Sequence, residues 1–297
     1  MKPIHDVIPA DLTGHADVVR RFSGIARLYG QPALERFRAA HVCVIGVGGV
    51  GSWIVEALAR SAVGALTLID LDNVAESNIN RQIQAMTGTI GQAKIAALAE
   101  RIAQINPYCK VTLVEQFITP GNLGQLIGTD RFDYIIDAID SARDKAALIA
   151  YCRRHALALM TIGGAGGQTD PTKIAVRDLS KTEQEPLLKR VRKLLRTDYG
   201  FPRGEKNKFN VDAVFSMEPL QLPAAAASAQ DADASADASA STGITGINCA
   251  GFGSSVVVTA SFGMVAAAHL LRKLADAPPL AGATRSALAE TAVYDQV

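Results

Sequence analysis

Hydrophobic residues gather in short runs that are separated by amphipathic stretches over much of the chain. Runs with the length of buried β-strands lie at 41–46, 65–70, 110–115, 132–137 and 157–162. Stretches with apolar residues at helical spacing lie at 49–62, 91–104 and 142–155. Because strands that alternate with helices form βαβ units, we predict an α/β fold with a Rossmann-like, doubly wound, mostly parallel sheet.

The regions on either side of this alternation have patterns of their own. Helices are predicted at 18–28 and 31–40, with Pro32 in the first turn of the second helix, where a missing N–H is tolerated. The alternating segment 173–177 and a polar helix through Arg196 predict an antiparallel C-terminal extension of the sheet. The predicted units are N-terminal helices (1–40), a Rossmann-like core (41–165), antiparallel strands with a basic helix (166–222), a low-complexity loop (223–242), and a small-residue helix with a tail (243–297).

Two later segments depart from the α/β pattern. Residues 223–242 lack large side chains that could offset the entropy of ordering, so we predict a mobile surface loop there. Residues 247–271 are apolar and long enough to cross a bilayer, but they are rich in glycine and serine and include His269. We expect a buried helix that packs closely through its small residues, and no stable membrane insertion.

Composition limits the classes of function. The 297 residues are 48% hydrophobic and 5% aromatic, which permits a sizeable aliphatic core. The formal charge is only +1, so any contact with nucleic acid must be a local basic patch. The four cysteines contain no C-x-x-C pair, which argues against a disulfide framework and a cysteine-based zinc site. The first residues resemble no signal peptide, so a cytoplasmic location is expected.

A glycine-rich turn follows the first predicted strand. Gly46, Gly48, Gly49 and Gly51 lie between that strand and a helix, where free backbone N–H groups and the helix dipole attract phosphate. Asp70 ends the next strand, at the spacing of a ribose-binding carboxylate. The motif therefore predicts a nucleotide site. The alternatives are a tight turn whose glycines only permit close packing, and a nicotinamide rather than an ATP site.

Cations near this turn favour ATP. Arg81 follows the second strand, and Lys94 opens the next predicted helix. A triphosphate needs cations to offset its charge, whereas a dehydrogenase needs no such pair. Either residue by itself could be an ordinary surface cation.

The fourth strand ends in two carboxylates, Asp137 and Asp140. Carboxylates at the carboxyl ends of parallel strands face the ligand crevice, and their hard oxygens suit magnesium that bridges phosphates. One of the two could instead cap the helix that starts at Ser141. We predict that Asp140 is the principal Mg²⁺ ligand.

Taken together, these motifs resemble the ubiquitin-activating-enzyme-like family of adenylating enzymes. The matching segments are 46–52, 58–70, 77–82, 91–94 and 137–140, within about residues 20–165. The resemblance implies that a carboxylate is adenylated with ATP and Mg²⁺, with Arg81, Lys94 and Asp140 as catalytic residues. It also implies that nucleotide contacts come from Gly46, Gly48, Gly49, Gly51, Asp70, Asp72, Asn78, Arg81, Gln82 and Lys94.

Further segments are similar to the bacterial tRNA-modifying branch of this family. They lie at 21–30, 142–154, 163–168 and 249–254. This resemblance implies that the carboxylate belongs to threonylcarbamoyladenosine beside the tRNA anticodon, which closes into a ring with loss of the elements of water and release of AMP and pyrophosphate. The alternative substrate is the C-terminus of a ubiquitin-like or sulfur-carrier protein. A nicotinamide-dependent oxidoreductase and a non-enzymatic binding module are weaker alternatives.

Partner contacts are the least specified by the sequence. The candidate tRNA patch is Lys189, Arg190, Arg192, Lys193 and Arg196, which could equally be the solvated face of an amphipathic helix. The resemblance implies a homodimer in which Arg21 or Arg27 reaches the partner's nucleotide. Cys249 has the surroundings of a buried structural cysteine, and a sulfur-relay role with a protein partner is the alternative.

Overall fold

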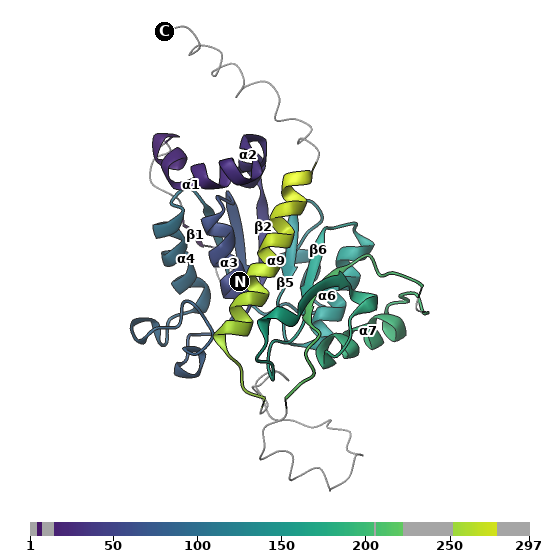
Figure 1. The fold of residues 1–297 in the computed structure, drawn as a ribbon. Coiled ribbons are helices and arrows are strands. Elements are labelled where there is room, and N and C mark those ends of the chain that lie inside the picture. Colours follow the sequence, from purple (N-terminus) through teal and green to yellow (C-terminus); the bar gives the residue numbers. More distant parts are fainter. Residues whose placement is uncertain (1–4, 8–14, 205, 222–251, 278–297) are drawn as a thin grey trace.

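An eight-stranded sheet lies at the centre of the computed structural model, which describes residues 5–7, 15–204, 206–221 and 252–277 (Figure 1). The strands are β1 (His5–Val7), β2 (His41–Ile45), β3 (Ala65–Ile69), β4 (Lys110–Val114), β5 (Tyr134–Asp137), β6 (Leu159–Ile162), β7 (Ile174–Asp178) and β8 (Asp212–Ser216). The helices are α1 (His15–Tyr29), α2 (Gln31–Ala39), α3 (Gly51–Arg60), α4 (Lys94–Ile105), α5 (Leu123–Leu126), α6 (Ala142–Arg154), α7 (Pro186–Asp198) and α9 (Val256–Asp276).

The strand order is β1-β4-β3-β2-β5-β6-β8-β7. All neighbours from β4 to β8 pair in parallel, and only the edge strands β1 and β7 are antiparallel to their neighbours. This confirms the predicted doubly wound, mostly parallel sheet. The strand order reverses between β2 and β5, and open α/β sheets bind ligands beyond the carboxyl ends of their strands at such a point.

The C-terminal extension differs from the prediction in one respect. The antiparallel strand β7 is present, but it joins the sheet through β8, which runs parallel to β6. Strand β8 lies within the unit 166–222 in which antiparallel strands were predicted, but its bounds were not predicted, although Ala213, Val214 and Phe215 within it are fully buried. Its apolar run is too short to be distinguished from a loop by periodicity.

Alternate residues of β2 divide the core into two layers. Val42 and Val44 belong to a cluster built with α3, α4 and α9, whereas Cys43 and Ile45 belong to a cluster built with α6 and α7. Because successive side chains of a strand point to opposite faces, the two helix sets cover opposite sides of the sheet. A strand buried on both faces explains why its sequence is an uninterrupted apolar run.

Helix α9 is the helix predicted from the apolar run 247–271, but it begins later, at Val256. Its length and composition would also suit a membrane span, and 44% of its most apolar window is buried inside the protein. Gly263 lies so close to α3 that an added Cβ would be 2.6 Å from the Cβ of Trp53. The small residues therefore permit the expected close helix packing. The predicted loop at 223–242 lies outside the described residues.

Candidate active site

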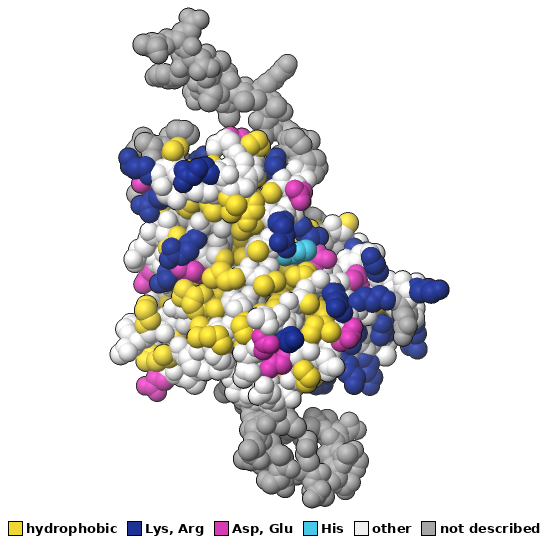
Figure 2. Space-filling model, in the orientation of Figure 1, with side chains coloured by type: hydrophobic (Ala, Val, Ile, Leu, Met, Phe, Trp, Pro, Cys, Tyr) yellow, Lys and Arg dark blue, Asp and Glu magenta, His cyan; other side chains and the backbone are white. Residues whose placement is uncertain are grey.

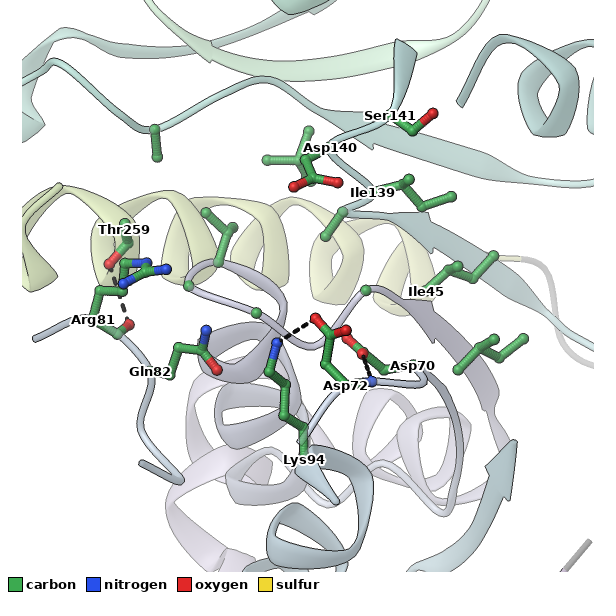
Figure 3. A pocket seen from close by; sticks show the side chains of 18 of the residues that line it. Ile45, Asp70, Asp72, Arg81, Gln82, Lys94, Ile139, Asp140, Ser141 and Thr259 are labelled. Atoms are coloured by element: carbon green, nitrogen blue, oxygen red, sulfur yellow. Dashed lines mark hydrogen bonds and ion pairs between the residues drawn. The ribbon is translucent and has the colours of Figure 1, made fainter. Parts of the chain in front are cut away.

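A cavity of about 460 Å³ opens at the carboxyl ends of the central strands, where the strand order reverses (Figure 3). It brings together ten of the predicted site residues: Gly46, Gly48, Gly49, Asp70, Asp72, Asn78, Arg81, Gln82, Lys94 and Asp140. Gly51 and Asp137 were also predicted to contact the ligand, but neither belongs to the cavity wall. Sequence motifs that are far apart along the chain thus meet in one hollow.

The glycines of the first turn have different tasks. Gly46 has φ +81°, and a Cβ there would lie 2.8 Å from the carbonyl oxygen of Ala138. A Cβ at Gly51 would overlap the carbonyl oxygen of Gly46, so this position requires glycine for the close packing of the turn. Gly48 is different, because the nearest atom to an added Cβ is Gln82 Nε2 at 3.9 Å. Its backbone is open to a phosphate.

Asp70, at the end of β3, ties this turn to the sheet. Its Oδ2 accepts a hydrogen bond from the N–H of Val47 (2.8 Å), and its Oδ1 accepts one from the N–H of Asp72 (2.9 Å). Burial raises the pKa of Asp70, and the nearby charge of Lys94 opposes that shift. Each carboxylate oxygen retains acceptor capacity, so the residue can also receive ribose hydroxyl groups.

Lys94 is a nearly buried cation in the cavity wall, 6% exposed. Its Nζ lies 2.7 Å from Oδ2 of the half-exposed Asp72, as Figure 3 shows. Helix α4 begins at Lys94 itself rather than at the predicted residue 91, because Gly91 has φ +85° and Ala93 pairs with Asn73 in an isolated β-bridge. This start points the first side chain of the helix into the site.

Arg81 belongs to a loop that is fastened to two helices. Its carbonyl oxygen accepts hydrogen bonds from Trp53 Nε1 of α3 (2.9 Å) and from Thr259 Oγ1 of α9 (3.4 Å). Its Nη1 donates to the carbonyl oxygen of Ser77 (2.6 Å). A Cβ added to Gly49 would lie 3.3 Å from the Arg81 side chain, which therefore extends along the glycine turn.

Two amides complete this side of the site. Asn78 is 8% exposed, and its Oδ1 accepts a hydrogen bond from the N–H of Ala75, which closes the short 3-10 turn Glu76–Asn78. Gln82 is 5% exposed and accepts a hydrogen bond from Gln84 Nε2 (3.0 Å). Both line the cavity as predicted, but part of their hydrogen-bonding capacity holds the loop itself.

The two carboxylates after β5 separate into different environments. Asp137 is fully buried, with its Oδ1 2.9 Å from Nζ of the equally buried Lys145 and its Oδ2 2.7 Å from Thr161 Oγ1. Its carboxylate thus faces the protein interior and is occupied by these partners rather than by the cavity. Asp140 is exposed and lines the cavity. Neither aspartate caps α6, whose first turn is capped by Ser141.

Several residues of the cavity wall were not predicted. Gln116, Phe117 and Ile118 follow β4 and line the cavity, where Phe117 and Ile118 form an apolar side. Phe117 is 55% exposed. Their place just beyond a predicted strand end was the available signal. Ser254 and Thr259 come from the approach to α9 and from its first turn. No local pattern links them to a site whose motifs lie far earlier in the chain.

The predicted basic patch forms a groove of its own, which we call the basic groove. Its cations come from α7 and the neighbouring loops: Arg177, Lys181, Lys189, Arg190, Arg192, Lys193, Arg196 and Arg203. On the opposite face of α7, Leu187, Leu188, Val191 and Leu195 are buried. Figure 2 shows Lys and Arg side chains gathered over this edge of the molecule.

Two of these arginines are partly held in place. Arg192 donates a hydrogen bond to Thr182 Oγ1, and burial lowers the pKa of Arg192. The Arg196 guanidinium lies over the ring of Phe209, 5.2 Å from its centroid. Lys189 and Lys193 are exposed.

Other predicted residues lie away from the cavity. Arg21 donates to Asp17 Oδ2 at 2.6 Å within α1, and neither Arg21 nor Arg27 belongs to the cavity wall. Cys43 is buried in β2. Cys152 is also buried, and burial raises its pKa to about 12. Cys249 lies outside the described residues. The described residues contain no group of three or more His, Cys, Asp or Glu side chains placed to hold a metal.

Comparison with known proteins finds similarity along most of the chain. The model of the ThiF family matches residues 22–295. The tRNA threonylcarbamoyladenosine dehydratase of Haemophilus influenzae is 51% identical over 86% of this chain and 93% of its own length. The crystal structure of Escherichia coli tRNA N6-threonylcarbamoyladenosine dehydratase in complex with ATP has a TM-score of 0.75 and 47% identity, covering 90% of this chain and 97% of that one. The AMP complex of the same enzyme has a TM-score of 0.76 at 48% identity, over 89% of this chain and 98% of that one.

Proposed function

The chain belongs to the ThiF family, and we propose that it uses ATP to adenylate the carboxylate of threonylcarbamoyladenosine in tRNA and then closes that side chain into a ring. The observation that carries this proposal is the cavity itself. It gathers an open glycine turn, a ribose-type carboxylate and two cations in a chain whose relatives of similar length are named tRNA threonylcarbamoyladenosine dehydratase. ATP in the related crystal structure supports the nucleotide.

The cavity wall suggests how the nucleotide lies. The apolar side formed by Phe117 and Ile118 suits the adenine ring, and Asp70 suits the ribose hydroxyls. Gly48, at the N-terminal side of α3, and Lys94 are placed for the phosphates. The strand order runs from β4 and β3 through β2 to β5 and β6. With the adenine ring beside β4, the phosphates of the nucleotide lie nearer to β5 and β6.

Asp140 fits the role of a magnesium ligand. Its carboxylate is exposed on the cavity wall, and Asp144 lies on the same wall one helical turn later. Mg²⁺ takes one or two protein carboxylates together with phosphate oxygens and waters, so this donor set suits it. Bound there, the ion would supply charge neutralisation for the departing pyrophosphate.

The proposed chemistry needs positioning rather than a protein nucleophile. A carboxylate oxygen of the substrate attacks the α-phosphorus of ATP, and the bond to pyrophosphate breaks. A neighbouring group of the same side chain then attacks the acyl carbon, loses its proton, and displaces AMP. Such an intramolecular attack gains effective concentration from proximity. The task of Arg81 and Lys94 is to offset the negative charge that develops on the phosphates.

Product analysis distinguishes this proposal from its rivals. We expect AMP and pyrophosphate to form from ATP and Mg²⁺ only when tRNA that carries threonylcarbamoyladenosine is present. ATP-pyrophosphate exchange that instead depends on a protein ending in Gly-Gly would favour a carrier-protein substrate. Binding of NAD without binding of ATP would favour an oxidoreductase.

The basic groove is proposed to bind tRNA phosphates. Its exposed lysines at positions 189 and 193 lie one helical turn apart on α7. We expect Lys189→Glu with Lys193→Glu to raise the KM for tRNA by about tenfold or more. The slope of the logarithm of the binding constant against the logarithm of the salt concentration should fall by the equivalent of about two phosphate contacts. The affinity for ATP should not change. Steady-state AMP formation at varied tRNA concentration measures the KM, and filter binding across a salt series measures the salt dependence.

The matched control reverses two exposed charges elsewhere. Arg20→Glu with Arg38→Glu changes the net charge equally, on α1 and α2. If this control weakens tRNA binding as much as the α7 variant does, the groove has no specific role and only the total charge matters.

We also propose that the exposed face of α9 joins two copies of the chain. Val257 is 54% exposed and Met264 is 43% exposed, although both belong to a helix whose other side is buried. Figure 2 shows hydrophobic side chains spread over this face of the molecule. Exposed apolar area of this kind marks protein interfaces. Light scattering should give twice the chain mass, and a monomeric mass would contradict the proposal.

A further inference from the structure

We propose that Glu185 is a positioning residue that fixes the glycine wall of the active-site cavity to helix α7. The glycine wall is the segment 163–167, which follows β6. This inference rests on the proposed function, because it assigns Glu185 the task of aligning tRNA bound in the basic groove with the active-site cavity.

A single buried carboxylate joins the two elements. Glu185 is 5% exposed, and its Oε1 accepts hydrogen bonds from the N–H of Gly164 (3.0 Å) and from the N–H of Leu187 (3.1 Å). Its Oε2 accepts one from the N–H of Leu188. The same side chain therefore caps α7 and holds the wall. A Cβ on Gly163 would lie only 3.1 Å from Glu185 Cγ, so the two are in direct contact.

The wall faces the reacting end of the cavity. Gly163, Ala165 and Gly166 line the cavity beside β6, while the adenine side lies beyond β4, at the other end of the strand order. A substrate carboxylate that attacks the α-phosphorus must approach in line with the bond to pyrophosphate, from the side opposite the leaving group. Gly163, Ala165 and Gly166 bound the cavity in which that approach takes place, so the position of the wall limits how the carboxylate is aligned.

Glycine-rich backbone does not hold a conformation by itself, because glycine has wide conformational freedom. The wall is fixed at its ends by backbone hydrogen bonds, from Gly163 N to Val214 O (2.8 Å) and from Gly167 N to Gly253 O (3.0 Å). Between these ends, the N–H of Gly164 donates a hydrogen bond to Glu185 Oε1 (3.0 Å). The carboxylate thus determines how far the middle of the wall extends into the cavity.

The basic groove reaches the back of this wall. A smaller hollow of about 400 Å³ is lined by Glu185 and Leu220 together with three residues of the groove: Pro186, Lys189 and Arg192. Leu220 in turn lies against the wall, since its Cδ2 is 3.2 Å from the position of a Cβ on Gly167. Phosphate-binding cations and the wall are thus attached to the same helix end.

Shortening the Glu185 side chain separates its two roles, which are to cap α7 and to hold the N–H of Gly164. Aspartate is among the best N-cap residues, so Glu185→Asp should keep α7 capped but withdraw the carboxylate from Gly164. We expect kcat for tRNA-dependent AMP formation to fall by about tenfold or more, because small misplacements at a reacting centre are costly. The KM for tRNA, the affinity for ATP and the melting temperature should stay near those of the wild type.

A second variant has the opposite pattern. Glu185→Gln keeps the length and an acceptor for Gly164, but its amide nitrogen cannot accept the N–H of Leu188. We expect this variant to be less stable than Glu185→Asp and yet to turn over faster. Glu35→Asp, on the exposed surface of α2, controls for the substitution itself.

The outcomes distinguish a failure of the positioning role of Glu185 from a failure of the proposed function. Loss of kcat in Glu185→Asp, with partial rescue in Glu185→Gln, supports the positioning role. Wild-type turnover in Glu185→Asp, or activity that simply follows thermal stability across the variants, overturns that role and leaves the proposed function intact. Wild-type protein that forms no AMP with the modified tRNA overturns the proposed function, and the positioning role with it.

Discussion

Lys94→Met is expected to lower kcat/KM for tRNA-dependent AMP formation by roughly 10²- to 10³-fold, the usual cost of removing one preorganised charge from a reacting site. Lys94 is almost buried in the cavity wall, where its charge acts with little screening by water. Methionine has a similar length and fills the same space without the charge. Steady-state AMP formation at varied ATP concentration and saturating tRNA measures the effect as kcat/KM for ATP.

The fold should tolerate this change. Asp72, the ion-pair partner of Lys94, has 53% of its side chain exposed, so water can solvate its carboxylate after the lysine is removed. Lys110→Met, at an exposed position of β4, is the matched control and should retain activity. Activity of Lys94→Met within about threefold of the wild type would remove Lys94 from the phosphate site, since a lost charge-assisted contact costs more than that.

Gly51→Ala is expected to destabilise the protein by about 3 kcal/mol or more, or to prevent folding, because overpacking against rigid backbone has no cheap relief. The new methyl group would overlap the carbonyl oxygen of Gly46 in the turn between β2 and α3. Neither neighbour can move without breaking the strand-to-helix connection. Chemical denaturation of the soluble fraction measures the loss.

Gly48→Ala is the matched control in the same turn. Its Cβ would meet only Gln82 Nε2, at 3.9 Å, so stability should stay within about 1 kcal/mol of the wild type. The methyl group would instead occupy space open to a phosphate, and the affinity for ATP should fall. Equal stability of the two alanine variants would contradict this expectation, because the turn would then have to relax around a methyl group at position 51 despite its close backbone contacts.

The sequence was most informative where local patterns decide the structure. The apolar run of β2 and the glycines after it identify a strand, a turn and a helix within a dozen residues. Lys94 and Arg81 could be predicted as a converging pair because strand ends and helix starts in this fold lie at one edge of the sheet. The positions of Asp70 and Asp140 follow from the same rule.

Side-chain direction at a strand end was harder to predict. Asp137 and Asp140 are three residues apart and both follow the same run, yet only Asp140 reaches the cavity. Asp137 still belongs to β5 and is paired with Lys145 of α6. Nothing in the polar character of Lys145 indicates that it is fully buried. The distinction depends on the partner helix, and hence on tertiary structure.

Contacts between distant segments were also beyond local reasoning. Thr259 donates to the carbonyl oxygen of Arg81 across 178 residues of sequence, and Glu185 accepts the N–H of Gly164 across 21. Both contacts follow from the packing of α9 and α7 on the sheet. Helix α7 was predicted by its charge and periodicity, but the second task of its cap residue is evident only in three dimensions.

The most direct test of the proposed reaction is mass spectrometry of nucleosides from tRNA that carries threonylcarbamoyladenosine. The tRNA is incubated with the protein, ATP and magnesium, then digested under mild conditions that preserve a hydrolysable ring. We expect the modified nucleoside to lose one water as AMP is released, and both products to be absent with Arg81→Ala and Asp140→Ala. An unchanged nucleoside from protein that binds ATP would contradict the reaction and point to a carrier-protein substrate.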